Sequence, residues 1–457
     1  MVGRGPARCH PPTVTEITSE STTAAPASPL HLADYRLFWL TRFCSTIATT
    51  AIAVVLGWQV YDVARASYGM SPNQAAFQLG IIGLVQFLPM FVLAPFAGLI
   101  ADRLDRRKVG ATAIGVDLAM ALGLALLTSA EALSLPLLFA LGSLHGVGRA
   151  FFGPSISAIG PSIVPPALLP RAVSLNSMAM QIGTVAGPAA GGLLYAASPA
   201  APYWTAAVLL AISCTCVLAI KPFPMPVLRT DLHPLRQIAE GFAYVRRERL
   251  LLGCITLDLF AVLLAGATAL LPVYARDILT WNGHPVGPAG LGQMRAAPAV
   301  GAAAVALLLS FRPIERNVGV KMLWAVIGFG LVTVIFGLSR NYLLSLSMLV
   351  LLGAADMVSM FVRGALVQLN TPDAMRGRIG SISGLAISAS NELGEMQSGL
   401  AAALLGATGA VVFGGVGAIV VTATWALIFP ELRRSRSFSS HYSQGAPTRA
   451  GSKEQGT

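Results

Sequence analysis

The chain has 457 residues, of which 55% are hydrophobic and only 11% are charged. A soluble globular protein carries about 25% charged residues, so this composition excludes an ordinary soluble fold. The net charge of +11 is typical either of a protein that binds nucleic acid or of a membrane protein with basic cytoplasmic loops. The positions of the basic residues along the chain distinguish these two classes.

Residues 1–33 are rich in Ser, Thr, Ala and Pro, which predicts a disordered cytoplasmic tail without a cleavable signal peptide. Twelve apolar segments follow, each long enough to cross a hydrocarbon layer of about 30 Å as a helix. The predicted spans are 39–62, 78–101, 109–129, 134–159, 172–196, 203–221, 249–274, 288–311, 319–338, 342–367, 378–405 and 408–429. We therefore expect an all-α membrane protein with twelve transmembrane helices.

Lys and Arg are distributed unequally between the connections. Counted with the adjoining span ends, the connections after even-numbered spans hold sixteen of these residues. Those after odd-numbered spans hold only Arg65, Arg276 and Arg340. Because Lys and Arg collect on the cytoplasmic side of membrane proteins, both chain ends are expected in the cytoplasm. The cytoplasmic connections of a protein in the lipid bilayer thereby account for the net positive charge, and no nucleic-acid partner is expected.

The two halves of the chain resemble each other in sequence. At an offset of 207 residues the aligned pairs include Arg171 with Arg378 and Gly187 with Gly394. This match predicts two pseudo-symmetric six-helix bundles, residues 34–221 and 249–431, as in transporters built from parallel repeats.

The connection between the bundles, residues 222–248, contains a predicted amphipathic helix. Its apolar face is formed by Leu235, Ile238, Phe242 and Val245. Arginines cluster at its end, as expected for a helix that lies on the inner membrane surface. Residues 432–457 are predicted to form a second disordered cytoplasmic tail.

The loop between the second and third spans concentrates charge. Its motif residues are Gly98, Asp102, Arg103, Arg106, Arg107 and Lys108. They resemble the signature of the major facilitator superfamily, Gly-x-x-x-Asp-Arg followed by basic residues, although Asp105 stands where that family usually has glycine. The resemblance implies that Asp102 latches the cytoplasmic side shut against the start of the eleventh span, near Gly377 and Arg378. The alternative is that the basic cluster only holds the loop in the cytoplasm.

The fifth span carries glycines around one proline. These residues are Gly183, Gly187, Pro188, Gly191 and Gly192. Glycine costs about 1 kcal/mol and proline about 3 kcal/mol inside a soluble helix, but in a bilayer small residues allow close helix contact. The run resembles in full the Gly-x-x-x-Gly-Pro-x-x-Gly-Gly pattern of the superfamily's antiporters; ordinary close packing is the alternative. Nearly the whole chain is similar to the enterobactin-exporter-like branch, whose members are exporters of the bacterial inner membrane.

Eight ionisable residues inside the predicted spans stand out as candidates for the transport pathway. They are Asp117, Arg149, Asp258, Arg295, Asp356, Arg363, Glu392 and Glu395. Each costs about 2.5–3.5 kcal/mol when it faces lipid near the bilayer centre, so these residues must face one another or water. Pairing the three arginines with acids leaves two carboxylates over, and such a carboxylate is suited to carry a proton.

We expect the surplus acids among Asp356, Glu392 and Glu395, with Asp258 next. In the 207-residue register Arg149 meets Asp356, which predicts an ion pair between the bundles. Asp117 lies on a helix that the family places outside the central cavity, and it is expected to be structural. For the other charged residues, the alternative to a role in transport is a static buried ion-pair network.

These features together predict a secondary transporter, not an enzyme. We expect it to export a small organic molecule, siderophore or drug-like, by alternating access as a monomer, with the proton gradient and no cofactor as its energy source. An importer of the same fold and a non-transporting scaffold or membrane enzyme are the alternatives. The chain contains no hydrolase, zinc-protease or nucleotide-binding motif. Its five cysteines fit no metal-ligand spacing, so no metal site is expected.

Overall fold

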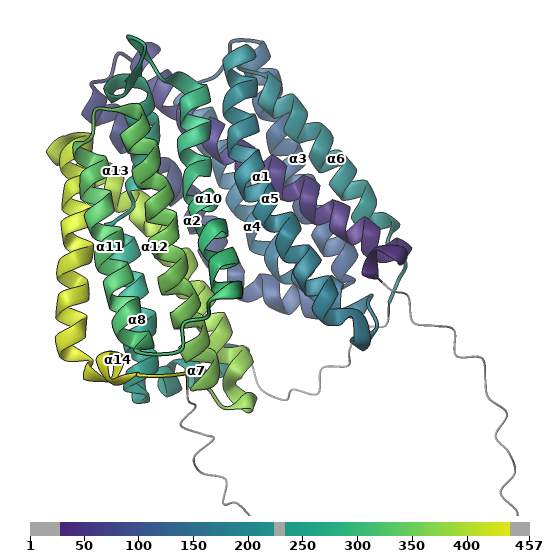
Figure 1. Cartoon of the computed structure of the whole chain (residues 1–457). Coiled ribbons are helices and arrows are strands. Elements are labelled where there is room, and N and C mark those ends of the chain that lie inside the picture. Colours follow the sequence, from purple (N-terminus) through teal and green to yellow (C-terminus); the bar gives the residue numbers. More distant parts are fainter. Residues whose placement is uncertain (1–27, 224–233, 439–457) are drawn as a thin grey trace, which may run out of the picture.

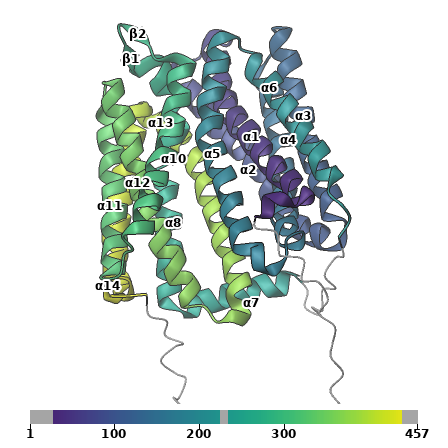
Figure 2. The same ribbon diagram turned by 45° about the vertical axis from the view of Figure 1, so that its right-hand side comes forward.

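The computed structural model of the protein describes residues 28–223 and 234–438. Two groups of helices lie side by side and are joined through a short helix at one end of the molecule (Figures 1 and 2). The first group consists of α1 (Ala33–Ala66), α2 (Pro72–Arg103), α3 (Arg106–Ser129), α4 (Leu135–Ser162), α5 (Leu169–Ala197) and α6 (Ala201–Ala219), with the one-turn helices η1 (Pro29–His31) and η2 (Pro166–Leu168). The predicted all-helical membrane fold is confirmed.

The second group follows the connecting helix α7 (Pro234–Arg247). Its elements are α8 (Arg249–Leu264), η3 (Ala267–Leu270), α9 (Leu271–Val273), η4 (Tyr274–Ile278), α10 (Gly287–Phe311), α11 (Val318–Leu338), α12 (Tyr342–Leu369), α13 (Asp373–Ile428) and α14 (Pro430–Arg434). The 56 residues of α13 are two helices joined at Gly406, whose φ of 74° breaks the helical path. The eleventh and twelfth predicted spans meet at this glycine.

Ten helices in the described part of the chain are long and apolar enough to cross a membrane. The long α13 counts once among them although it crosses twice, and α5 does not appear because its composition is less apolar. The sequence of α5 is rich in Gly, Ala, Ser and Asn, which suits a helix that is packed closely against others rather than surrounded by lipid. Adding α5 and the second half of α13 gives the twelve predicted spans.

The seventh predicted span, 249–274, is not one helix. The structure ends α8 at Leu264 and continues with the short elements η3, α9 and η4 to Ile278. Pro272 has no N–H group, so it cannot bond to the carbonyl of Thr268 one turn earlier. That carbonyl accepts a hydrogen bond from Arg295 Nη1 at 2.7 Å instead. The break in the helix therefore supplies an acceptor for a charged side chain inside the protein.

A two-stranded hairpin follows this span, and the sequence analysis does not predict it. Strand β1 (Thr280–Trp281) pairs with β2 (His284–Pro285) through a turn at Asn282 and Gly283, which have φ values of 51° and 80°. Asn-Gly is the preferred sequence for a tight turn with two left-handed residues. We call the end of the molecule that carries β1 and β2 the hairpin side, and the end that carries α7 the linker side (Figure 2).

The two halves contact each other through glycines on the hairpin side. A Cβ atom at Gly80 of α2 would lie 2.9 Å from the carbonyl oxygen of Met396 in α13, and one at Gly292 of α10 would lie 2.6 Å from the carbonyl oxygen of Pro188 in α5. On the linker side of α2 and α13, a Cβ at Gly98, Gly380 or Gly384 would meet no atom of the described structure outside its own helix within 4 Å. The halves are therefore joined on the hairpin side and diverge toward the linker side (Figure 1).

Candidate transport site between the two halves

Two glutamates of α13 form the centre of the candidate site. Glu392 and Glu395 are one helical turn apart, and each pairs with an arginine from a different helix. Arg149 Nη1 of α4 lies 2.6 Å from Glu392 Oε1, and Arg295 Nη2 of α10 lies 3.3 Å from Glu395 Oε1. Since α4 and α13 belong to different halves, the pair of Arg149 and Glu392 joins the two bundles inside the membrane.

The predicted ion pair between Arg149 and Asp356 is therefore wrong. Equivalent positions of two pseudo-repeats are related by an axis between the bundles, and nothing requires their side chains to touch. Helix α2 packs against both α4 and α13, which places these two helices around a common neighbour. The guanidinium of Arg149 consequently reaches Glu392, which is only 7% exposed.

Glu395 lies where the other half approaches most closely. A Cβ atom at Gly83 of α2 would be 3.0 Å from the Cβ of Glu395, so a larger residue at this position would require the two helices or the glutamate to shift. A cavity of about 40 Å³ adjoins the Arg295–Glu395 pair and is lined by residues from both halves, among them Gln86 and Pro272. A cavity of this size holds one or two water molecules beside the carboxylate.

Of the three remaining acids, two have a basic partner and one has none in the described part of the chain. Asp258 of α8 forms a buried ion pair with Arg363 of α12. Asp117 of α3 lies 2.8 Å from His145 Nδ1 of α4 and belongs to the interior of the first half. Asp356 of α12 makes no hydrogen bond or ion pair with any residue in the described part of the chain. Of the acids expected to be in surplus, Asp356 is the one left without a cation.

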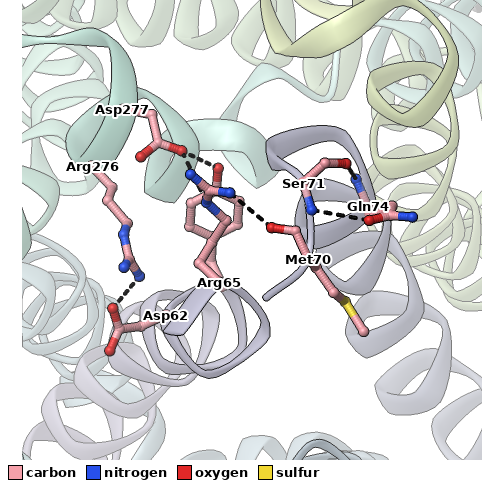
Figure 3. A network of polar contacts seen from close by, with 8 residues as sticks. Asp62, Arg65, Met70, Ser71, Gln74, Arg276 and Asp277 are labelled. Carbon is pink, nitrogen blue, oxygen red and sulfur yellow. Dashed lines mark hydrogen bonds and ion pairs between the residues drawn. The ribbon is translucent and has the colours of Figure 1, made fainter. Parts of the chain in front are cut away.

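Two groups of charged residues were missed by the sequence analysis. The first is Arg42, which lies within the predicted span 39–62 and adds a fourth arginine to the charged residues inside the spans; it is 9% exposed. The second is a network on the hairpin side between the end of α1 and η4 (Figure 3). In the sequence, Arg65 and Arg276 serve only to assign the topology. Each stands close to an aspartate, which is the one signal in the sequence for this network.

The hairpin-side network joins the two halves at the membrane boundary. Arg276 of η4 pairs with Asp62 of α1, and the Tyr61 hydroxyl donates a hydrogen bond to Asp277. Arg65 Nε lies 3.7 Å from Asp277 Oδ2, and Arg65 Nη1 donates to the Met70 carbonyl at 2.7 Å (Figure 3). Two ion pairs thus connect the halves on this side.

The charged loop after α2 is organised by Asp105. Its carboxylate caps the first turn of α3 and lies 2.6 Å from Arg107 Nη2, while Arg107 Nη1 donates to the Ile220 carbonyl at the end of α6. The hydrogen bond from Arg107 lowers the pKa of the Asp105 carboxyl. Arg106 Nε donates to the Ala101 carbonyl at 3.3 Å, and Arg103 is exposed. The side chain of Asp102 lies outside the described residues.

The expected partner of Asp102 has another contact in this structure. Arg378, at the start of α13, lies 2.8 Å from Glu240 of the connecting helix α7. The predicted apolar face of α7 is divided: Val245 is buried at 4% exposure, whereas Phe242 is 63% exposed. The side chains of Leu235 and Ile238 lie outside the described part.

The glycines of α5 face two different helices. Gly183, Gly187 and Gly191 lie against α1, where a Cβ at Gly191 would be 3.0 Å from the Ala51 carbonyl oxygen. Gly192 instead lies against Pro288 and Gly292 of α10, across the boundary between the halves. The motif therefore serves packing within the first half and contact with the second.

Twelve membrane helices in two bundles, with opposite charges meeting between them, define a transporter of the major facilitator fold. The chain belongs to the transmembrane secretion effector family, whose profile matches residues 24–449. It is therefore a transporter and not an enzyme.

Curated relatives extend over most of the chain. The chain is 27% identical over 410 residues to the enterobactin exporter EntS of Citrobacter koseri, covering 88% of this chain and 93% of the relative. The enterobactin exporter of Shigella boydii is 28% identical over the same shares. The relatives thus support a transporter of the exporting kind.

Solved structures show the same fold at low sequence identity. A peptide transporter of the POT type matches with a TM-score of 0.69 at 13% identity, covering 90% of this chain and all of that one. The nucleoside transporter NupG gives a TM-score of 0.68 at 12% identity over 87% of this chain and all of that one. A bacterial ferroportin homologue in an inward-facing state gives 0.64 at 17% identity over 88% and 98%.

Proposed function

We propose that this protein is a proton-coupled exporter of a small organic molecule, siderophore or drug-like, in the bacterial inner membrane. It works as a monomer by alternating access, needs no cofactor, and has both chain ends in the cytoplasm. The observation that carries the proposal is the ion pair between Arg149 and Glu392, which crosses from one half to the other at a buried carboxylate. Removing the charge of Glu392 releases Arg149 and uncouples the halves at that point.

The proposed cycle begins with a proton that enters from outside. Protonation of Glu392 abolishes its attraction for Arg149, because a neutral carboxyl group no longer balances the guanidinium charge. Loss of the proton to the cytoplasm restores the pair. Asp356, which has no cation partner in the described part, is the second proposed proton carrier, and the pairs Asp258–Arg363 and Arg295–Glu395 hold the helices around it.

The distribution of contacts supports an inward-facing form. The excess of Lys and Arg assigns the linker side to the cytoplasm. The close glycine contacts between the halves lie on the opposite, hairpin side, so in this proposal the vestibule opens to the cytoplasm and accepts substrate there. Export then requires that the hairpin-side network opens and the linker side closes.

The helix register supports the proposed latch in the closed state. In the antiparallel pair α2 and α13, Gly80 faces Gly399. Continuing this register along both helices brings Asp102 opposite Gly377, next to Arg378. Closure of the linker side would thus bring the loop motif to its expected partner, after Arg378 leaves Glu240.

The test is transport in inverted membrane vesicles, whose outer face is the cytoplasmic one. Wild-type vesicles receive the substrate in the outside medium and an imposed proton gradient. They should accumulate at least one compound from a panel of siderophores and lipophilic drugs, and an uncoupler should abolish this accumulation. Glu392→Gln should lower accumulation by about tenfold or more, as loss of a proton-transfer group does, yet retain exchange of substrate down its gradient.

Glu131→Gln, which removes an exposed carboxylate, is the matched control and should behave as wild type. Accumulation that is insensitive to the uncoupler, or Glu392→Gln vesicles that still concentrate substrate, would contradict proton coupling through Glu392.

A further inference from the structure

Arg42 is a buried arginine whose partners are all uncharged. Its Nε donates to Asn176 Oδ1 of α5 at 3.2 Å, and its Nη2 lies 2.7 Å from Met180 Sδ. The guanidinium also lies over the Phe152 ring of α4, with 5.6 Å between its carbon and the ring centroid. No carboxylate of the described chain pairs with it, whereas Arg149, Arg295 and Arg363 each bind one.

An arginine at membrane depth needs a counter-charge or ample hydrogen bonding. An amide oxygen, a thioether and an aromatic ring stabilise a cation, but they do not neutralise it. The guanidinium has five N–H donors in a fixed fork that matches two oxygens of an acidic group. The contacts above occupy only part of this fork.

Arg42 lies close to the surface that faces the linker side, although its own side chain is buried. It lies in the linker-side part of α1, and its partner Met180 is 41% exposed. The next residue on α5, Gln181, donates to the Ala299 carbonyl of α10 at 3.0 Å, so this stretch of α5 faces the other half. A solute that enters between the diverging halves meets this surface.

We propose that Arg42, Asn176, Met180 and Phe152 form a subsite for the acidic group of an organic anion. The guanidinium binds the anionic oxygens, and the planar apolar body of the ligand packs against Met180 and Phe152. The proposal rests on the export function above and assigns a charge class to its substrate.

Two dyes with the same ring system and opposite charge test this subsite. Fluorescein is an anion and rhodamine 6G a cation, and both contain a xanthene ring. Binding is measured by fluorescence polarisation with the purified full-length protein in detergent. Arg42→Gln should weaken fluorescein binding by about tenfold or more, as expected for the loss of charged hydrogen bonds, and should leave rhodamine 6G binding within about twofold. Arg42→Lys should give an intermediate loss, because lysine keeps the charge but not the fork.

Arg36→Gln is the matched control, since Arg36 is an exposed arginine on the same helix; it should bind both dyes as wild type. Should Arg42→Gln fail to fold, Phe152→Leu provides the same test and should weaken fluorescein binding several-fold. Wild-type protein that does not bind fluorescein, or a folded Arg42→Gln with unchanged affinity, overturns the subsite. If the subsite is overturned but vesicles still accumulate a cationic dye, the export function stands. If Arg42→Gln weakens fluorescein binding but wild-type vesicles accumulate no compound, export is refuted and the subsite is supported.

Discussion

Asp105 shows how an aspartate can replace a glycine at the tight turn between α2 and α3. The turn residue has a φ of −57°, which any residue adopts, so the backbone does not require glycine. The side chain adds what glycine lacks: it caps α3 and holds Arg107, which in turn reaches the end of α6. The departure from the family pattern therefore adds a connection between three helices.

We predict that Asp105→Ala destabilises the protein at neutral pH. Loss of the cap should lower the free energy of unfolding by about 0.5–2 kcal/mol. The Asp105 carboxyl has a lower pKa in the folded chain than its ordinary value of 3.8, so its contribution is present above that value and is lost as the pH falls through the folded value. Thermal unfolding in detergent should show a lower midpoint at pH about 7 and a smaller difference at pH about 3.

Asp105→Asn is the control for that experiment, because asparagine also caps helices and removes only the charge. Its midpoint should lie between those of wild type and Asp105→Ala. Equal midpoints for all three proteins would show that the cap is dispensable.

The sequence predicts which residues are charged inside the membrane, but not which of them meet. Helical periodicity places Glu392 and Glu395 on one face of a helix, and this holds in the structure. The partner of Arg149 depends on the rotation and tilt of α4 relative to α13, which no local pattern contains. A count of charges needs no geometry, so the sequence predicts that two of the five acids lack an arginine, but that these are Asp117 and Asp356 depends on the helix packing.

Among the elements, α5 carries two glycine surfaces with different consequences. Gly191 packs against α1 within the first half, in a contact that the proposed movement of the halves leaves intact. Gly192 packs against α10 of the other half, in a contact that the proposed cycle breaks when the hairpin side opens. Two adjacent glycines thereby belong to different interfaces.

We predict different results for the two corresponding valine variants. Gly191→Val should lower the thermal midpoint strongly, because overpacking costs about 1–3 kcal/mol or more where backbone atoms lie in the way. Gly192→Val should change the midpoint little and instead favour the form that is open on the hairpin side, measured as faster alkylation of a cysteine placed there. Ala196→Val, at an exposed position of the same helix, should affect neither measurement. A Gly192→Val protein with wild-type alkylation would contradict this division.

Element boundaries follow from the sequence where caps and apolar length agree, as for α2 with its capping box of Ser71 and Gln74. The apolar run 249–274 predicts a continuous seventh span, and Gly266 and Pro272 do not exclude one because both residue types are tolerated in membrane helices. Their effect depends on neighbours: Gly266 lies against the Gly394 backbone, and Pro272 leaves a carbonyl that Arg295 binds. The hairpin is short enough that only its Asn-Gly turn signals it.

At the scale of the whole molecule, closure of the hairpin side depends on glycine contacts together with the network of Asp62, Arg65, Arg276 and Asp277. The side chains of Asp62 and Arg276 are 38% and 27% exposed. Ion pairs of this exposure contribute about 0–1 kcal/mol each. The network is therefore strong enough to bias the two forms of the proposed cycle and weak enough to break in each round of it.

We predict that Asp62→Asn combined with Asp277→Asn shifts the population toward the form that is open on the hairpin side. Loss of both pairs should raise the ratio of open to closed molecules by up to about tenfold, the equivalent of about 1.4 kcal/mol. Distances between spin labels at Tyr68 and Trp281, both exposed at this side, report the shift. Glu131→Gln should leave the distance distribution unchanged, and an unchanged distribution in the double variant would rule out the network as a gate.

The placement of this network in partly exposed surroundings makes it responsive to the ionic strength of the medium. The Debye length falls from about 30 Å at 0.01 M salt to about 3 Å at 1 M, so added salt weakens the attraction between Asp62 and Arg276. In the pair of Arg149 and Glu392 only the carboxylate is buried, at 9% side-chain exposure, so added salt screens this pair less. In the proposed cycle, high external salt should thus favour opening of the hairpin side and release of the substrate, with less effect on the proton-sensitive pair. The same label distances, recorded at low and high salt, would reveal this difference.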